Sequence, residues 1–283
     1  MTLARVLEET RRTLEANGIE EAAVEADLFL MKALGVDRAG LYASPERTLS
    51  TEERQTLARD MARRLNGEPW PYISGHREFY GLDFRVGPRV FIPRPETELL
   101  VDLALEAAHA LPADRTILIA DACTGSGAIA IALAVHLPNA RFYATDMSTL
   151  TLDVAQRNCE DHGVEDRVTI LDGDLLRGVP SGLDIVVSNP PYVPRTELPY
   201  LAREVRTETL VSLDGGDGGL EIIRALVPQA LGRLRRPGTF IMELSPEQGD
   251  AVREMCLAIA PDADVTLHND LAGLTRAIRA MLP

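Results

Sequence analysis

Hydrophobic residues recur every three to four positions through the first part of the chain, which is the spacing of one helix face. One such run ends at an Asn-Gly pair at 17–18, and a second, over 22–34, ends at a glycine. Ser-Thr-Glu-Glu at 50–53 has the form of a capping box, and the helix it begins should end near the Asn-Gly pair at 66–67. The pattern predicts a small helical bundle. Because it carries no catalytic constellation, we expect it to bind a partner or cover a site.

The pattern changes to a two-residue alternation after this bundle. Residues 78–86 alternate apolar and polar side chains around Gly81, as the two strands of a hairpin do. Pro95 then suits the first turn of a following helix. We therefore expect residues 69–95 to be a hairpin linker between two domains.

Short apolar runs alternate with longer helical patterns through the rest of the chain. Repeated β-α units of this kind predict a parallel sheet covered by helices on both faces. The last two apolar runs are joined by a loop alone, which puts an antiparallel element at one edge. The expected strands are 116–122, 141–145, 167–171, 184–187, 239–244, 264–267 and 275–280, and the expected helices include 128–137, 150–161 and 220–234.

Composition narrows the class of protein. The 283 residues are 46% hydrophobic, enough for a substantial core, yet no apolar run is long enough to span a membrane and the charged N-terminus does not read as a signal peptide. The three cysteines are scattered, which fits a reducing cytoplasm, and no Cys/His spacing predicts a metal site. A net charge of −14 argues against broad attraction to nucleic acid or anionic membranes.

A glycine-rich loop, Cys-Thr-Gly-Ser-Gly at 123–127, follows the strand at 116–122 and opens a helix. Its glycines let a ligand approach the backbone, and the helix N-terminus offers free N–H groups. Asp146 ends the next strand, where a carboxylate can accept hydrogen bonds from ribose hydroxyls. Asp174 and Leu175 follow the third strand and could border an adenine. The arrangement predicts a nucleoside-containing cofactor, either NAD or S-adenosylmethionine.

The sequence Asn189-Pro190-Pro191-Tyr192, after the strand at 184–187, distinguishes these two cofactors. Proline has no backbone N–H, so this stretch mainly accepts hydrogen bonds. The side-chain carbonyl of Asn189 and the backbone carbonyl of Pro190 could each accept one N–H of a planar –NH₂ group, with Tyr192 packed on its face. A methyltransferase acting on an amide or amino nitrogen has a use for such a loop, whereas a hydride-transfer enzyme does not. We therefore expect Asn189, Pro190 and Tyr192 to be catalytic.

With these motifs in view, the chain resembles the HemK/PrmC family, the protein-(glutamine-N5) methyltransferases of class I peptide chain release factors. The resemblance covers nearly the whole chain. It implies an α/β fold, a Rossmann-like class I S-adenosylmethionine-dependent methyltransferase sheet of seven mostly parallel strands with one antiparallel edge strand, and a small N-terminal helical bundle. The matching pieces are 67–69, 72–73, 77–81, 91–98 (Phe-Ile-Pro-Arg-Pro-Glu-Thr-Glu), 124–127, 189–192, 204–206, 215–220, 248–249 and 270–273.

The resemblance also implies a role for each part. Residues 1–68 would bind the release factor, 69–95 would link the domains, and 96–283 would form the methyltransferase domain. The substrate would be the glutamine of the Gly-Gly-Gln loop, and the enzyme a cytoplasmic monomer with no metal, no stable nucleic-acid partner and no membrane partner. The implied cofactor-binding residues are Cys123, Thr124, Gly125, Ser126, Gly127, Asp146, Asp174, Leu175 and Asn189; the implied substrate-binding residues are Asn189, Pro190, Pro191, Tyr192, Phe91 and Pro93.

Three positions depart from the family pattern, and three other functions stay open. Cys123 stands where glycine is commoner, which should matter little because a backbone N–H serves whatever the side chain. Thr209 replaces a usual proline and Ser245 a usual glycine, which leaves the shape of 193–220 open. The alternatives are an adenine-N6 or cytosine-N4 methyltransferase of nucleic acid, for which we would expect a basic face, a cofactor-binding module without catalysis, and an NAD-dependent oxidoreductase.

Overall fold

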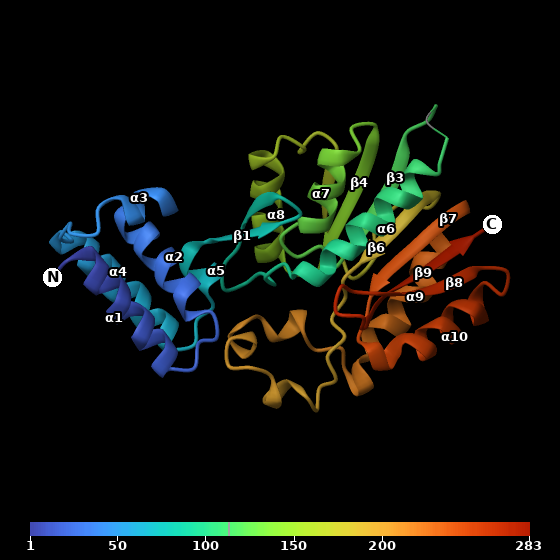
Figure 1. Cartoon of the computed structure of the whole chain (residues 1–283). Helices are drawn as coiled ribbons and strands as arrows, with labels where there is room; N and C mark the ends of the chain where they lie inside the picture. Colours follow the sequence, from blue (N-terminus) through green and yellow to red (C-terminus); the bar gives the residue numbers. More distant parts are fainter. Residues whose placement is uncertain (113) are drawn as a thin grey trace. The chain divides into compact units, whose positions relative to one another are not determined.

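The computed structural model describes residues 1–112 and 114–283, and these form two compact units (Figure 1). The first unit contains Met1–Gly75 together with the short segment Arg203–Thr207, and the second contains His76–Ala202 and Glu208–Pro283. The first residues of the expected linker over 69–95 lie in the first unit, and its hairpin lies in the second unit.

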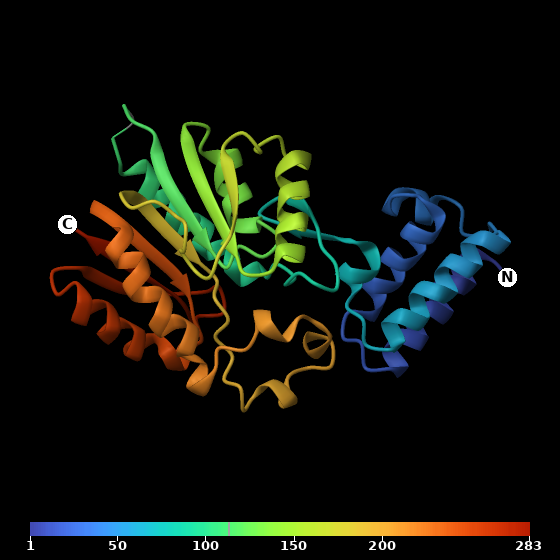
Figure 2. The same ribbon diagram turned by 180° about the vertical axis from the view of Figure 1, so that it is seen from behind.

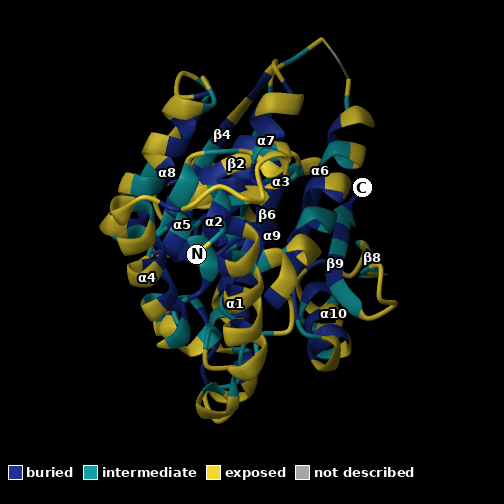
Figure 3. Ribbon diagram, turned by 60° about the vertical axis from the view of Figure 1, so that its left-hand side comes forward, coloured by how far each residue is buried: buried dark blue, intermediate teal, exposed yellow. Residues whose placement is uncertain are grey.

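The first unit is built from helices whose apolar stripes face one another. They are α1 (Leu3–Ala16), α2 (Ala22–Leu34), α3 (Arg38–Ala43), α4 (Thr51–Leu65) and α5 (Trp70–Ser74). Figure 3 shows buried and exposed stripes along α1 and α4. The capping box is present, since Ser50 accepts a hydrogen bond from the Glu53 N–H and the Glu53 carboxylate accepts one from the Ser50 N–H. The short helices α3 and α5 are not predicted from the sequence.

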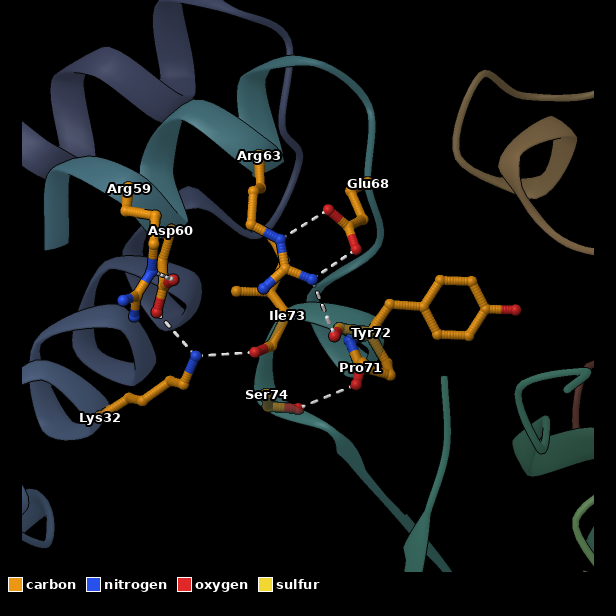
Figure 4. A network of polar contacts seen from close by, with 9 residues as sticks. All are labelled: Lys32, Arg59, Asp60, Arg63, Glu68, Pro71, Tyr72, Ile73 and Ser74. Carbon is orange, nitrogen blue, oxygen red and sulfur yellow. Dashed lines mark hydrogen bonds and ion pairs between the residues drawn. The ribbon is translucent and has the colours of Figure 1, made fainter. Parts of the chain in front are cut away.

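Two cations fasten α5 to the longer helices (Figure 4). Lys32 of α2 donates hydrogen bonds to Asp60 of α4 at 2.6 Å and to the carbonyl of Ile73 at 2.7 Å. Arg63 of α4 donates to Glu68 at 2.7 Å and to the carbonyl of Tyr72 at 3.2 Å. The last carbonyls of a helix have no intrahelical partner, so these side chains satisfy groups that so short a helix leaves open.

The segment Arg203–Thr207 is held by α4 and the loop after it. Arg203 donates to the carbonyl of Asn66 at 2.7 Å, and Arg64 pairs with Glu204 at 2.7 Å. Gly67 has a φ of 94°, and a Cβ there would lie 2.6 Å from Nε of Arg203. Glycine at 67 therefore allows this close approach.

The second unit begins with the hairpin of β1 (His76–Phe79) and β2 (Leu82–Arg85), and its centre is a seven-stranded sheet of order β5-β4-β3-β6-β7-β9-β8. The predicted sheet is confirmed: neighbours from β5 to β7 are parallel, and the antiparallel element lies at one edge. The strand that runs against the others is β9, one place inside the edge strand β8. The strands are β3 (Ile117–Ala122), β4 (Ala140–Asp146), β5 (Val168–Asp172), β6 (Leu183–Ser188), β7 (Leu234–Glu243), β8 (Asp264–Asn269) and β9 (Thr275–Leu282).

Helices cover both faces of this sheet (Figures 1 and 2). Side chains alternate between the two faces of a strand, so Ile185 and Val187 of β6 enter one core and Val186 enters the other. Burial on both faces explains why the central strands read as continuous apolar runs. The first core packs against α6 (Glu98–His109), α7 (Ala128–His136) and α8 (Thr149–Asp161), and the second against α9 (Glu221–Arg233) and α10 (Gly249–Ile259).

The strand order reverses between β3 and β6. From β3 the chain moves outward to β4 and β5 on one side, and β6 and β7 lie on the other side. Ala122 at the end of β3 pairs with Ser188 at the end of β6. In open α/β sheets, ligands bind outside the carboxyl ends of the strands at such a point. The loops 123–127 and 189–192 therefore start side by side.

Candidate active site

A cavity of about 310 Å³ lies at this reversal point, within the size range of small-molecule sites. The structure brings almost all of the predicted site residues together around it, while what each one binds stays a prediction. Gly127 is the exception, because it caps the start of α7 and does not line the cavity. The predicted residues that line it are Phe91, Pro93, Cys123, Thr124, Gly125, Ser126, Asp146, Asp174, Leu175, Asn189, Pro190, Pro191 and Tyr192.

Asp146 connects the end of β4 to the glycine loop. Its two carboxylate oxygens accept hydrogen bonds from the N–H of Gly125 at 3.1 Å and the N–H of Ser148 at 3.0 Å. Burial raises the pKa of Asp146, whereas these backbone donors lower it. A carboxylate has about four acceptor sites, so Asp146 keeps capacity for the hydroxyls of a ribose. This donor and acceptor set fits the sugar of a nucleoside cofactor.

Two residues of the cavity wall hold a left-handed backbone although neither is glycine. The φ of Cys123 is 59° and that of Leu175 is 52°. Such a conformation costs roughly 1–2 kcal/mol for an ordinary residue and persists where its surroundings hold it. The hydroxyl of Thr145, for example, donates to the carbonyl of Leu175 at 2.5 Å. The expectation that Cys123 matters little stays a prediction; the structure adds that glycine would adopt this φ without strain.

The loop 189–192 presents acceptors at the end of β6. Ser188, just before it, donates to the carbonyl of Ala122 at 2.7 Å and so holds the ends of β6 and β3 together. The amide nitrogen of Asn189 donates to Oγ1 of Thr97 at 3.0 Å. With its –NH₂ group engaged, Asn189 keeps its side-chain oxygen as an acceptor. The hydroxyl of Tyr192 donates to Oε1 of Glu243 at 3.0 Å.

Gly219 packs closely against the backbone of Tyr192. Gly219 lies so close that a Cβ on it would be 2.1 Å from the carbonyl oxygen of Tyr192. The side-chain nitrogen of Gln248 donates to that same carbonyl at 2.9 Å and to the carbonyl of Gly219 at 3.2 Å. Glycine at 219 thus has a steric reason, which the sequence motif alone does not reveal.

The wall formed by Phe91 and Pro93 is held by charged side chains. Arg94 lies over the ring of Phe91, 5.0 Å from its centroid, and pairs with the buried Glu208. Glu208 also accepts a hydrogen bond from the N–H of Ile92 at 3.2 Å. Burial raises the pKa of Glu208, and the nearby Arg94 charge lowers it. These contacts fasten residues 91–94 to the chain that follows residue 207.

Both remaining departures from the family pattern are compatible with the local backbone. Thr209 has a φ of −67°, which a proline would also adopt, and its hydroxyl donates to the carbonyl of Pro88 at 3.4 Å. Ser245 is the N-cap of a short 3₁₀ helix, Pro246–Gln248, with a φ of −78° that does not require glycine. Neither substitution therefore distorts the wall of the cavity.

Two residues that the sequence motifs left without a role complete the site. Thr97 and Glu243 are only 3% and 2% exposed, and the Thr97 hydroxyl donates to Oε2 of Glu243 at 2.6 Å. Burial raises the pKa of Glu243, and the hydroxyls of Thr97 and Tyr192 lower it. A carboxylate inside an apolar strand is rarely buried without partners, and that was the available signal for Glu243.

Comparison with known proteins decides the family. Residues 5–75 match the PrmC N-terminal domain and residues 98–209 match the methyltransferase small domain. The chain is 42% identical to the release factor glutamine methyltransferase of Moorella thermoacetica, over 99% of this chain and 98% of that protein. It is 39% identical to the protein of the same name from Bradyrhizobium diazoefficiens, over 97% of this chain and 94% of that protein. The chain belongs to the release factor glutamine methyltransferase family.

Solved structures agree on the fold of this release factor glutamine methyltransferase family member. The chain is similar to a methyltransferase from Pyrococcus furiosus, with a TM-score of 0.53 and 18% identity over 79% of this chain and 98% of that one. It is also similar to the hMettl16 catalytic domain, solved with an RNA hairpin of the MAT2A 3′UTR, with a TM-score of 0.58 and 19% identity over 79% of this chain and 84% of that one. The predicted class I methyltransferase fold is confirmed.

Family membership also establishes the enzyme class. The chain is a methyltransferase that uses S-adenosylmethionine, as the sequence motifs predict. Across residues 1–112 and 114–283, no group of three or more His, Cys, Asp or Glu side chains is placed to hold a metal ion. Within the same residues, no helix combines the length and the apolar character needed to cross a bilayer.

Proposed function

We propose that the chain methylates the side-chain amide nitrogen of the glutamine in the Gly-Gly-Gln motif of class I peptide chain release factors. The observation that carries the proposal is that residues 123–126 of the glycine loop and residues 189–192 of the acceptor loop line the same cavity. The names of relatives that match nearly the full length support glutamine as the substrate over an amino group of adenine or cytosine in nucleic acid.

S-adenosylmethionine supplies a methyl group bound to a sulfonium, which is a strong electrophile. In our proposal the loop 123–127 holds its amino-acid end, with backbone N–H groups at the start of α7 facing the carboxylate. Asp146 accepts the ribose hydroxyls, and Asp174 and Leu175 border the adenine. The exposed Asp174 and the buried Leu175 offer a polar edge and an apolar surface for that base.

The protein's main task is to orient a poor nucleophile. The lone pair of an amide nitrogen is delocalised into its carbonyl, so it attacks only when held in line with the methyl carbon. In our proposal the side-chain oxygen of Asn189 and the carbonyl of Pro190 accept its two N–H groups. Such positioning can lower a barrier by roughly 7–11 kcal/mol, and fixed dipoles that favour positive charge on nitrogen add about 3 kcal/mol.

The proposed chemistry needs no strong base before attack, because the amide proton becomes acidic only as the N–CH₃ bond forms and the S–CH₃ bond breaks. That proton would then pass to water, and S-adenosylhomocysteine would leave. Tyr192, whose hydroxyl is tied to Glu243, would pack on the planar carboxamide. Phe91 and Pro93 would close the other side and keep water from the sulfonium. The reaction is then determined by geometry and by acceptors that are already in place.

A direct assay tests this function. A purified class I release factor is incubated with the chain and methyl-labelled S-adenosylmethionine, then digested and analysed by mass spectrometry. We expect one labelled methyl group on the glutamine of Gly-Gly-Gln and none on a factor with glutamate at that position. Label confined to other residues, or to co-purified nucleic acid, would contradict the proposal.

We further propose that the helical part, residues 1–68, binds the body of the release factor, with 69–95 as linker and 96–283 as the catalytic domain. The proposal includes a monomeric enzyme that acts in the cytoplasm without a stable nucleic-acid partner. Support comes from the match of residues 5–75 to the PrmC N-terminal domain and from the net charge of −14.

Deleting residues 1–65 should separate partner binding from chemistry. We expect kcat/KM on the whole release factor to fall at least about tenfold more than kcat/KM on a short Gly-Gly-Gln peptide, the factor that 1.4 kcal/mol of lost binding represents. The deletion also removes the partners of Arg203 and Glu204, but any disturbance from that source affects both substrates. Equal losses on protein and peptide would refute a partner-binding role.

A further inference from the structure

A chain of hydrogen bonds leads from the acceptor loop into the protein interior. Asn189 donates to Thr97 at 3.0 Å, and Thr97 donates to Oε2 of Glu243 at 2.6 Å. The other oxygen of Glu243 accepts the Tyr192 hydroxyl at 3.0 Å. Glu243 thus contacts both ends of the loop 189–192, once directly and once through Thr97.

The elements that carry these residues are fixed by the fold. Thr97 ends the 3₁₀ turn Pro95–Thr97, which leads directly into α6. Glu243 is the last residue of β7, where it pairs with Ala277 of β9. Both side chains are almost fully buried, and Thr97 also lines the cavity. Thr97 belongs to the Pro-Glu-Thr-Glu sequence at 95–98, to which the proposed chemistry otherwise gives no role.

The direction of each hydrogen bond follows from counting donors. In its ionised form, which the hydroxyls of Thr97 and Tyr192 and the charge of Arg276 favour, the Glu243 carboxylate can only accept, so it takes the single hydroxyl hydrogen of Thr97. The Thr97 oxygen then has only lone pairs left to offer, and the group of Asn189 that faces it must be the –NH₂. The amide of a free asparagine could turn over and exchange its oxygen for its nitrogen. Here the partners allow one orientation.

We propose that Glu243 and Thr97 are positioning residues that hold the Asn189 carboxamide with its oxygen available to the substrate amide. The inference rests on the proposed function, since it concerns how the acceptor for the glutamine N–H is oriented. Without the Thr97 hydroxyl, the Asn189 amide can present either end. The flipped form would place an N–H against the N–H of the substrate and repel it.

The test removes the hydroxyl and keeps the shape. In the full-length enzyme, Thr97→Val should lower kcat on a Gly-Gly-Gln peptide about tenfold or more, while the Kd for S-adenosylhomocysteine changes little. Thr97→Ser keeps the hydroxyl and should restore most of the rate. Thr239→Val makes the same exchange at a mostly buried threonine of β7 that does not line the cavity, and should leave kcat unchanged.

A double-mutant cycle with Asn189→Ala distinguishes a Thr97 that orients Asn189 from a Thr97 that only stabilises the fold. Because Thr97 acts through Asn189, Thr97→Val should cause little further loss of kcat in the Asn189→Ala enzyme, measured by single-turnover methyl transfer. Additive losses, or a Thr97→Val enzyme with the wild-type kcat, would overturn the inference. If Thr97→Val lowers the thermal midpoint strongly, Thr97→Ala removes the same hydroxyl without the added methyl group and replaces it in the cycle.

Different results would refute the proposed function and the positioning role of Thr97 and Glu243. A wild-type enzyme that transfers no methyl group to the glutamine peptide would overturn the proposed function, and the inference with it. A wild-type enzyme that transfers normally, but whose Thr97 variants lose activity independently of Asn189, would overturn the inference alone.

Discussion

Replacing Asn189 with alanine should lower the rate of methyl transfer by about 10³-fold, in line with the loss of a preorganised dipole at a reacting group. The substitution removes the acceptor that orients one N–H of the substrate amide. The affinity for S-adenosylmethionine, measured by calorimetry, should fall by less than about tenfold, because most of the proposed cofactor contacts come from the loop 123–127, Asp146, Asp174 and Leu175.

The matched control is Asn139→Ala, since Asn139 is exposed and does not line this cavity. Both enzymes should unfold at the same urea concentration within experimental error. An Asn189→Ala enzyme with near-normal turnover would rule out the assigned role. If the variant instead lost cofactor binding and turnover together, Asn189 would be assigned to cofactor binding and not to orientation of the substrate amide.

Gly219→Ala should both destabilise the protein and impair transfer. A Cβ at this position would lie 2.1 Å from the carbonyl oxygen of Tyr192 and 2.5 Å from the side-chain nitrogen of Gln248, so the backbone of the acceptor loop has to move. The glycine also has a φ of 71°, which alanine adopts only with strain. We expect the free energy of unfolding to fall by about 2–4 kcal/mol, measured by urea denaturation.

Gly218, next to Gly219, allows the effect of backbone strain to be separated from the effect of the contact with Tyr192. Gly218 has a φ of 59°, but a Cβ on it would meet nothing within 4 Å. Gly218→Ala should therefore cost only the backbone strain, roughly 1–2 kcal/mol, and keep most of the activity. If both substitutions behaved alike, the close approach to Tyr192 would not matter, and the support for the acceptor loop would have to come from elsewhere.

The architecture was predictable from the sequence because the central strands are buried on both faces. Double burial produces uninterrupted apolar runs such as the one in β6, and the residues after parallel strands meet at one edge of the sheet. The loops 123–127 and 189–192 could therefore be placed together from the sequence pattern alone. The predicted strand at 239–244 begins at Leu234 in the structure, because the Arg-Arg-Pro-Gly sequence at 235–238 hides its start.

Two features were missed for different reasons. The helix α10 has a local signal that was not used, because its buried residues Gly249, Val252 and Cys256 recur at helical spacing. The contact between Thr97 and Glu243 joins residues 146 positions apart. Such a contact exists only after α6 and β7 have packed into the same unit. The sequence motifs identified many of the residues that line the cavity, but not Thr97, which also lines it, nor Glu243, which binds Thr97 and Tyr192.

The proposed reaction requires the chain to hold a carboxamide nitrogen between two oxygen acceptors, opposite the methyl group of the cofactor. The most direct measurement is a crystal structure of the enzyme with S-adenosylhomocysteine and a Gly-Gly-Gln peptide. We predict that the glutamine nitrogen lies within hydrogen-bond distance of both the Asn189 side-chain oxygen and the Pro190 carbonyl, facing the cofactor sulfur. An Asn189 side chain turned away from that sulfur, with no space for a carboxamide between them, would contradict the account.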